Sequence, residues 1–222
     1  MSKTAKEAKF IPLRIAVITI SDSRSPENDT SGDYLADSLV NEGHRLSFRK
    51  IAADDRYVLR AEVSALIADD GIDVILTTGS TGLTGRDVAP DALLPLFDKD
   101  IEGFGELFRA ASLSDIGAST IQSRAFAGLA NATIIFCMPG SPGACRTAWE
   151  EVIRPQLDAR TRPCNLANLM PRFKEYTTDS RSARFGFFVG APLAGRKKPA
   201  RMRRLFNASG LPVLKNRDLS GM

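Results

Sequence analysis

The sequence predicts an α/β protein with an open, mostly parallel sheet and helices on both faces. Three observations favour this fold class. Several apolar runs lack polar interruptions, which is typical of strands buried on both faces. Segments with apolar residues at helical spacing lie between these runs, and polar turns separate the two kinds of segment. In a sheet of this kind, ligands bind at the carboxyl ends of the strands.

The first strand and the first helix are predicted near the amino terminus. Leu13–Ile20 is a nearly unbroken run of branched apolar residues, which suits a strand covered on both faces. A polar loop follows. Thr30 or Ser31 can then cap a helix, because either side chain can accept a hydrogen bond from a backbone N–H of the first turn.

The second strand is shorter and covers Leu46–Ile51. Asp54 or Asp55 is expected to cap the helix that follows, since both are good N-cap residues and apolar side chains recur at helical spacing after them. Ile72–Thr78 predicts a third buried strand, which leads directly into a glycine-rich segment.

The second half of the domain continues the alternation. A helix begins at Pro90, and Pro95 is expected to bend or end it. Phe104–Ala111 predicts another helix, Thr133–Met138 a fourth buried strand, and Ala144–Leu157 a last helix.

Charge divides the 222-residue chain into two parts. Residues 171–222 carry 12 Lys and Arg against three Asp and Glu, whereas residues 1–170 carry 18 against 23. The strand and helix patterns also stop near this point. We therefore expect an N-terminal arm (1–12), an α/β domain (13–165) and a basic, poorly ordered extension (166–222). A solvated charge run is favoured over a nucleic-acid or membrane contact, so neither partner is expected.

Composition excludes several classes of protein. No apolar run approaches the roughly 18–20 residues that span a bilayer. Pro12 and Arg14 interrupt the apolar segment near the amino terminus, so no signal peptide is expected. The three cysteines are an odd number without CxxC spacing, which suits reduced thiols in the cytoplasm. His44 is the only histidine and excludes a histidine-rich metal site.

Three loops that follow predicted strands or begin helices can carry chemistry. The segment TGSTGLTGRD (78–87) has three glycines for close backbone approach to an anion, hydroxyl donors, a cation and a carboxylate. It is neither a Walker loop, which needs a lysine, nor GxGxxG. PGSPG (139–143) has a serine that can cap a helix or donate to a phosphate, and Ser31-Gly32 also lies at a helix start.

The chain resembles the MoaB/MogA family of molybdenum cofactor biosynthesis proteins, and the MoaB branch in particular. The resemblance runs from about Arg14 to Asn165 and rests on GSTG, RDxxPDA, GFGE, SR and PGSPGA in that order. It implies a three-layer, doubly wound molybdopterin-binding fold, a homo-oligomer (trimer or hexamer) and a molybdopterin-binding site. It also implies adenylylation of molybdopterin with ATP and Mg²⁺, and contacts with other proteins of the pathway.

The same resemblance implies site residues. Asp87 matches the family's second catalytic aspartate, and Asp54 is the best match for the first, with Asp55 as the neighbouring alternative. Both carboxylates would hold Mg²⁺. The substrate-binding residues implied are Ser31, Gly32, Gly79, Ser80, Thr81, Gly82, Arg86, Glu106, Ser123, Arg124, Gly140 and Ser141. Ser80 stands where the family usually has glycine. Because a backbone nest needs no side chain there, Ser80→Gly is expected to preserve or improve pterin binding.

The leading hypothesis is therefore an adenylyltransferase that moves AMP from ATP to the terminal phosphate of molybdopterin and releases pyrophosphate. Its domain is acidic although both substrates are anions, so backbone N–H groups, a few arginines and Mg²⁺ must neutralise the phosphates. The alternative is a non-catalytic molybdopterin carrier or scaffold with the same pocket.

Overall fold

A six-stranded sheet forms the centre of the computed structural model, which describes residues 8–175. Its strand order is β2-β1-β3-β6-β5-β4. The strands are β1 (Arg14–Ile20), β2 (Arg45–Ala52), β3 (Val74–Thr78), β4 (Lys99–Asp100), β5 (Phe126–Ala130) and β6 (Thr133–Met138). Strands β2, β1, β3 and β6 are mutually parallel, whereas β5 is antiparallel to β6 and β4 is antiparallel to β5. The predicted fold class is confirmed.

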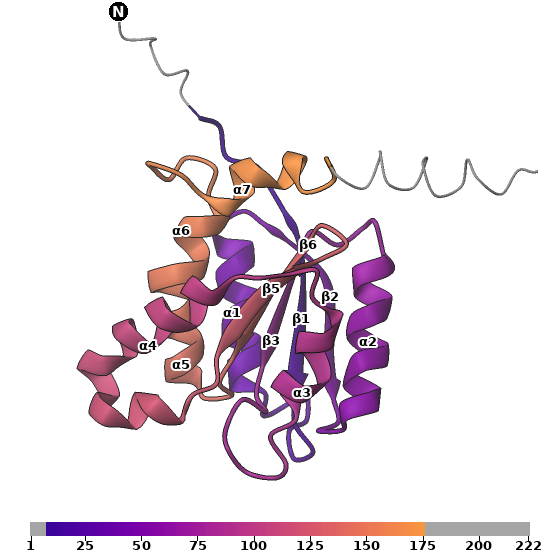
Figure 1. Ribbon diagram of the computed structural model, residues 1–222, viewed down its shortest axis with the longest axis vertical. Coiled ribbons are helices and arrows are strands. Elements are labelled where there is room, and N and C mark those ends of the chain that lie inside the picture. Colours follow the sequence, from indigo (N-terminus) through magenta and orange to yellow (C-terminus); the bar gives the residue numbers. More distant parts are fainter. Residues whose placement is uncertain (1–7, 176–222) are drawn as a thin grey trace, which may run out of the picture. The chain divides into compact units, whose positions relative to one another are not determined.

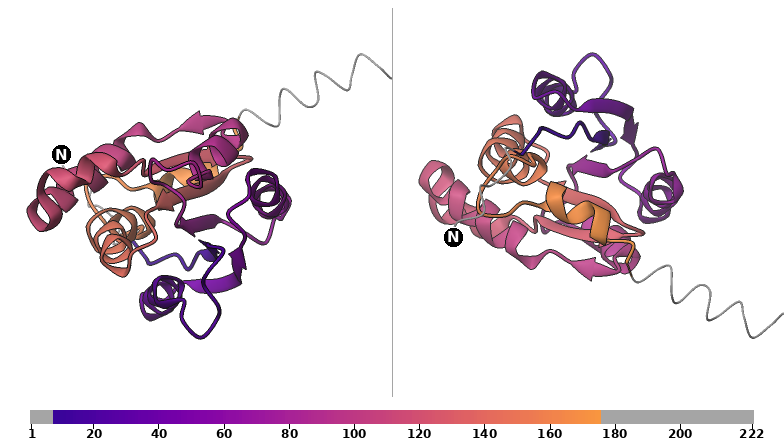
Figure 2. Two further views of the ribbon diagram at one scale, coloured as in Figure 1. Left: turned by 90° about the horizontal axis from the view of Figure 1, so that it is seen from below. Right: turned by 90° about the horizontal axis from the view of Figure 1, so that it is seen from above.

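Helices cover both faces of this sheet (Figure 1). The helical segments are α1 (Thr30–Asn41), α2 (Arg56–Ala68), α3 (Ala89–Leu93), η1 (Leu94–Leu96), α4 (Glu102–Ile116), η2 (Gly117–Gln122), α5 (Pro142–Thr147), the π-helical η3 (Ala148–Ile153), α6 (Arg154–Leu157), α7 (Leu166–Leu169) and η4 (Met170–Arg172). Views roughly along the strands show helices standing on either side of the sheet (Figure 2).

Alternate residues of each central strand contribute to two separate cores. Val17 and Leu76 pack with α1, α4 and the α5–α6 segment, whereas Ile18 and Ile75 pack with α2 and α3. All four of these side chains are fully buried. Two apolar faces explain why these strands read as continuous apolar runs without polar alternation.

The sequence missed β4 and β5, and the backbone of the connecting turn explains why. Asn131 and Ala132 join β5 to β6 as a two-residue loop, and both have positive φ, 48° and 69°. Two consecutive positive φ angles are the geometry of the tight hairpin turn whose usual sequence is Asn-Gly or Asp-Gly. Asn-Ala does not carry that signal, and β4 has only two residues.

The N-cap of α1 is Asp29, and not Thr30 or Ser31 as the sequence indicated. Its carboxylate accepts a hydrogen bond from Gly32 N at 3.0 Å and another from Thr19 Oγ1 at 2.8 Å. Asp29 is 1% exposed and also pairs with Arg49 at 3.1 Å. A buried carboxylate can serve all three donors at once, which a hydroxyl cannot.

Both ends of the packed domain extend beyond residues 13–165. Upstream, the ring of Phe10 lies 5.0 Å from that of His44. Downstream, Ala167 is buried, and Met170 and Phe173 pack against the core on the α1 side. The remaining part of the predicted basic extension, residues 176–222, lies outside the described residues. Among residues 8–175, no helix has the length and apolar character needed to cross a membrane.

His44 should make the fold sensitive to acid. It is 5% exposed, and its Nδ1 accepts a hydrogen bond from Leu13 N at 3.2 Å. Burial lowers the pKa of His44 below its ordinary value, although the charges of Glu42 and Asp158 oppose this. The unfolded chain therefore binds a proton at a higher pH than the folded chain. We expect the free energy of unfolding to fall as the pH drops below about 6.5.

The expected loss is about 1–3 kcal/mol, because protonated Nδ1 could no longer accept from the buried Leu13 N–H. Thermal unfolding between pH 7.5 and 5 measures it. The matched control is His44→Asn, whose side-chain oxygen can still accept from Leu13 but does not titrate in this range. Parallel pH profiles for the wild type and His44→Asn would contradict the assignment.

Candidate functional site

Three loops meet at one edge of the sheet. Thr19 of β1 pairs with Thr78 of β3, and Thr78 pairs with Met138 of β6, so the three parallel strands end side by side. The loop after β3 is tied to β6 by a hydrogen bond from Gly79 N to Met138 O at 2.9 Å. The sequence-predicted loops therefore converge at the carboxyl ends of the strands, where an open α/β sheet binds its ligand.

Gly79 allows the loop after β3 to begin. Its φ is +106°, a region that residues with a side chain rarely adopt. A Cβ at this position would also collide with the carbonyl oxygen of Ile20 at the end of β1. Gly79 thus shapes the loop, and it does not itself line the cavity described below.

Ser80 is the next residue and has φ +59°. Its hydroxyl donates to Asp54 Oδ1 at 2.5 Å and accepts from the backbone N of Val88 and Ala89 at 2.7 and 3.1 Å. Asp55, in contrast, caps α2 by accepting from Tyr57 N and Val58 N. Of the two alternatives that the sequence left open, this geometry favours Asp54 as the site carboxylate.

Asp87 closes the glycine-rich turn. Its Oδ2 accepts from Thr84 N at 2.8 Å and from Thr84 Oγ1 at 2.6 Å. Burial opposes ionisation, but the hydrogen bonds from Thr84 and the Gly82 backbone and the charge of Arg124 outweigh it and lower the pKa of Asp87. Asp87 is therefore an anion at neutral pH.

Asp54 differs from Asp87 in its electrostatics. Its pKa is raised, first by burial and then by the negative charges of Asp22 and Asp87, against the hydrogen bond from Ser80. Asp22 joins this group because its carboxylate accepts from Asp54 N at 2.9 Å and pairs with Arg86 at 2.8 Å. The Arg86 side chain is otherwise largely exposed. A cation would relieve the repulsion between these carboxylates.

Arg124 binds the loop backbone. Its guanidinium donates to the carbonyl oxygens of Gly82 and Asp87, both at 2.7 Å. Its own backbone N donates to Thr81 O at 3.0 Å. In this structure Arg124 therefore holds the glycine-rich loop in shape, and it lies outside the lining of the cavity.

Ser31 and Gly32 lie in the first turn of α1, next to the loop after β6. Ser31 is 2% exposed and donates from Oγ to Gly140 O at 2.8 Å, which fixes the loop after β6. A Cβ on Gly32 would collide with the Asp29 carboxylate. Glu106 lies on the exposed side of α4.

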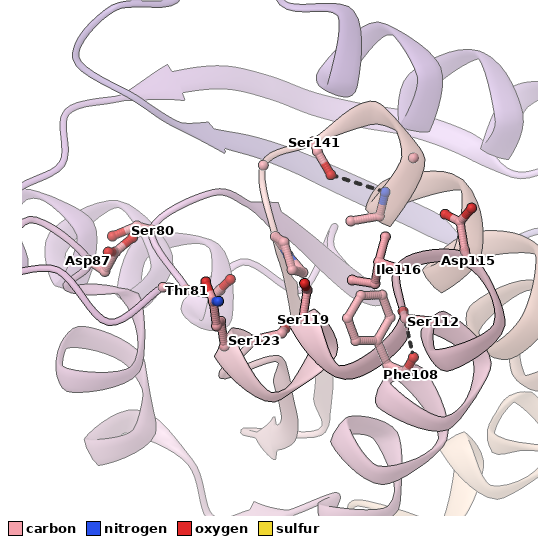
Figure 3. A pocket seen from close by; sticks show the side chains of 16 residues that line it. Ser80, Thr81, Asp87, Phe108, Ser112, Asp115, Ile116, Ser119, Ser123 and Ser141 are labelled. Carbon is pink, nitrogen blue, oxygen red and sulfur yellow. Dashed lines mark hydrogen bonds between the residues drawn. The ribbon is translucent and has the colours of Figure 1, made fainter.

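A cavity of about 500 Å³ opens beside these loops (Figure 3). Its lining residues are Ser80, Thr81, Gly82, Asp87, Phe108, Ser112, Asp115, Ile116, Ser119, Gln122, Ser123, Pro139, Gly140, Ser141, Gly143 and Ala144. Seven of the sequence-predicted site residues are in this lining: Ser80, Thr81, Gly82, Asp87, Ser123, Gly140 and Ser141. The others, namely Ser31, Gly32, Asp54, Gly79, Arg86, Glu106 and Arg124, are not.

The sequence missed the wall formed by α4 and η2. This wall contributes Phe108, Ser112, Asp115, Ile116, Ser119 and Gln122. The available signal was the run of small polar residues from Ser112 to Ser123, which is unusual for a helix that only packs on a sheet. The cavity is therefore rich in hydroxyl groups. Its lining has two carboxylates, Asp87 and Asp115, and no Lys or Arg.

A divalent cation fits this donor set when water or substrate phosphates complete its coordination. Among residues 8–175, no group of three or more His, Cys, Asp or Glu side chains is close enough to hold a metal ion. Mg²⁺, however, is commonly held by one or two carboxylates together with substrate phosphates and water. Asp54 and Asp87, whose charges interact, can supply two such carboxylates.

Comparison with known proteins identifies the family of the chain. Residues 16–159 match the family described as "Probable molybdopterin binding domain". Over 165 residues the chain is 59% identical to molybdenum cofactor biosynthesis protein B of Escherichia coli, covering 74% of this chain and 96% of that protein.

Solved structures indicate the same family. A crystal structure of a molybdenum cofactor biosynthesis protein B is 43% identical, with a TM-score of 0.65 over 66% of this chain and 92% of that one. The MoaB described as a molybdopterin biosynthesis enzyme from Thermus thermophilus is 28% identical, with a TM-score of 0.58 over 64% and 90% of the two chains. The chain therefore belongs to the MoaB family of molybdenum cofactor biosynthesis proteins and contains its molybdopterin-binding domain.

Proposed function

We propose that this protein binds molybdopterin in the cavity between the glycine-rich loop and α4–η2, and adenylylates it with ATP. The observation that carries the proposal is that Ser80 and Asp87 line a cavity rich in hydroxyl groups, and that Ser80 binds a second carboxylate, Asp54. Neutral donors suit the orientation of phosphate, and carboxylate oxygens suit a hydrated divalent cation.

In this reaction the terminal phosphate oxygen of molybdopterin attacks the α-phosphorus of ATP. A new O–P bond forms, the bond between the α-phosphorus and the bridging oxygen breaks, and pyrophosphate leaves. The attacking phosphate oxygen is already ionised, so no protein nucleophile or general base is needed. Bound Mg²⁺ would supply charge neutralisation at the transferring phosphoryl group.

The chain's own groups position the reactants. Thr81 and Ser141 line the cavity on opposite loops, where their hydroxyl groups can orient phosphate oxygens. Arg124 keeps the glycine-rich loop in one conformation through its two carbonyl contacts. Positioning of this kind is the main contribution that a protein makes to phosphoryl transfer.

Purified full-length protein tests the proposal when it is supplied with molybdopterin, ATP and Mg²⁺. Release of pyrophosphate that requires all three components is the expected result. Molybdopterin binding without pyrophosphate release would instead support the alternative, a non-catalytic molybdopterin carrier or scaffold. No binding of molybdopterin would contradict both.

The proposal includes a homo-oligomer, a trimer or a hexamer. Leu107, Leu113 and Ile121 of the α4–η2 surface are 59%, 56% and 80% exposed, which leaves apolar area for a second copy to cover. Sedimentation velocity at micromolar concentration distinguishes these states from a monomer. We further propose that the protein works in the cytoplasm with other proteins of the pathway, where the exposed thiol of Cys164 would stay reduced.

A further inference from the structure

The Ser80 hydroxyl connects three separate parts of the site. It donates to Asp54 of the β2–α2 loop and accepts from Val88 and Ala89 at the start of α3. Ser80 itself belongs to the loop after β3 and lines the cavity. Asp87 lies beside it at the edge of the cavity (Figure 3).

The pattern of donors and acceptors determines where the hydroxyl proton points. A serine hydroxyl has a single proton and two lone pairs. The N–H groups of Val88 and Ala89 use the lone pairs. The proton has two acceptors within reach, Asp54 Oδ1 at 2.5 Å and Arg86 O at 3.5 Å, and the much shorter distance directs it at Asp54. This leaves Asp54 Oδ2 without a hydrogen bond within the described part of the chain.

The backbone indicates that this hydroxyl has a role. Ser80 has φ +59°, where glycine is the favoured residue and a side chain is unfavourable. A strained position of this kind persists only where the surrounding contacts stabilise it, and such positions cluster at functional sites. These contacts give the hydroxyl group a role at Asp54, and the expectation that Ser80→Gly leaves pterin binding intact stays a prediction.

We propose that Ser80 is a positioning residue that holds the Asp54 carboxylate in one orientation, with Oδ2 presented to the same divalent cation as Asp87. The proposal rests on the proposed function for the identity of that cation as Mg²⁺. The contacts of the Ser80 hydroxyl group are made within the folded chain, so they set the orientation of Asp54 before any ligand binds.

Mn²⁺ binding tests this role without any measurement of adenylyl transfer. Mn²⁺ replaces Mg²⁺ at oxygen sites, and electron paramagnetic resonance counts the free ion directly. We expect Ser80→Gly and Ser80→Ala each to weaken Mn²⁺ binding by about tenfold relative to the wild-type protein. Glycine relieves the φ strain and alanine keeps it, so equal losses would assign the effect to the hydroxyl group.

A double-mutant cycle with Asp54→Asn separates positioning from general damage. If Ser80 acts through Asp54, Ser80→Gly causes no further loss of Mn²⁺ binding in the Asp54→Asn background. Ser114→Ala, an exposed serine on α4 whose Oγ donates to Ala111 O, is the matched control and should bind Mn²⁺ normally. A crystal structure of the wild type should show Asp54 in one rotamer, whereas a crystal structure of Ser80→Gly should show it in several.

Three results would overturn the proposal. The first is wild-type Mn²⁺ affinity in both Ser80 variants. The second is an equal loss of Mn²⁺ affinity from Ser80→Gly in the wild-type and Asp54→Asn backgrounds, and the third is no Mn²⁺ binding by the wild-type protein. Failure of the proposed function would look different, because adenylyl transfer would be absent while the Mn²⁺ coupling between Ser80 and Asp54 persisted.

Discussion

Asp87→Asn is expected to lower the rate of adenylyl transfer by about 10²–10³-fold, the usual cost of losing one preorganised electrostatic element. Asn has nearly the same shape, and its amide oxygen, placed where Asp87 Oδ2 lies, can still accept from both Thr84 N and Thr84 Oγ1. The turn should therefore persist. What is lost is the negative charge that a hard cation requires. The affinity for molybdopterin should stay close to that of the wild type.

Two further variants give this experiment its controls. Asp87→Ala removes the acceptor as well as the charge, so the turn loosens and both turnover and molybdopterin affinity should fall. Asp37→Asn removes an exposed carboxylate on α1 that does not line the cavity, and it should change neither. If Asp87→Asn loses affinity and turnover equally, Asp87 is a structural cap. If turnover is unchanged, Asp87 takes no part in metal binding and Asp54 acts without it.

The parallel part of the fold was predictable from the sequence because each central strand is buried on both faces. In a globular domain, a short continuous apolar run that ends in a glycine-rich turn, such as Ile72–Thr78, is typical of a strand in a parallel sheet. The antiparallel edge was not predictable, because Asn131 and Ala132 adopt positive φ without the glycine that usually marks such a turn. Asn131 is held by contacts that exist only in the folded domain, since its N donates to Asp98 Oδ2 at 2.7 Å and its Nδ2 to Ile67 O at 2.9 Å.

Some parts of the candidate site were likewise predictable from the sequence, and others were not. The glycine-rich loop was visible because closely spaced Gly, Ser and Thr after a buried strand are characteristic of anion binding. Arg124 is different: a motif cannot tell a guanidinium that contacts a ligand from one that binds the carbonyls of Gly82 and Asp87. The α4–η2 wall was missed for a third reason, since only the packing of the chain brings Ser112 and Ser119 to face the loops.

Gly79→Ala should produce the largest loss of stability among the loop variants. The residue has φ +106°, and a Cβ there would collide with the carbonyl oxygen of Ile20. Strain at such a φ costs about 1–3 kcal/mol, and forcing an atom into a packed backbone costs a similar amount. The collision is with backbone at the end of β1, so no flexible side chain can move away. We expect the free energy of unfolding to fall by about 3 kcal/mol.

For a domain of this size that loss corresponds to a decrease of roughly 6–12 °C in melting temperature, measurable by calorimetry. Gly85→Ala is the matched control. It lies in the same loop, its φ is not in the positive region that disfavours side chains, and its Cβ would have no heavy atom within 4 Å. The control should melt within about 1–2 °C of the wild-type protein, because only a small surface change is made. Equal melting temperatures for Gly79→Ala and Gly85→Ala would mean that the ends of β1 and β3 are farther apart than the structure has them, and the cavity beside them would then have a different shape.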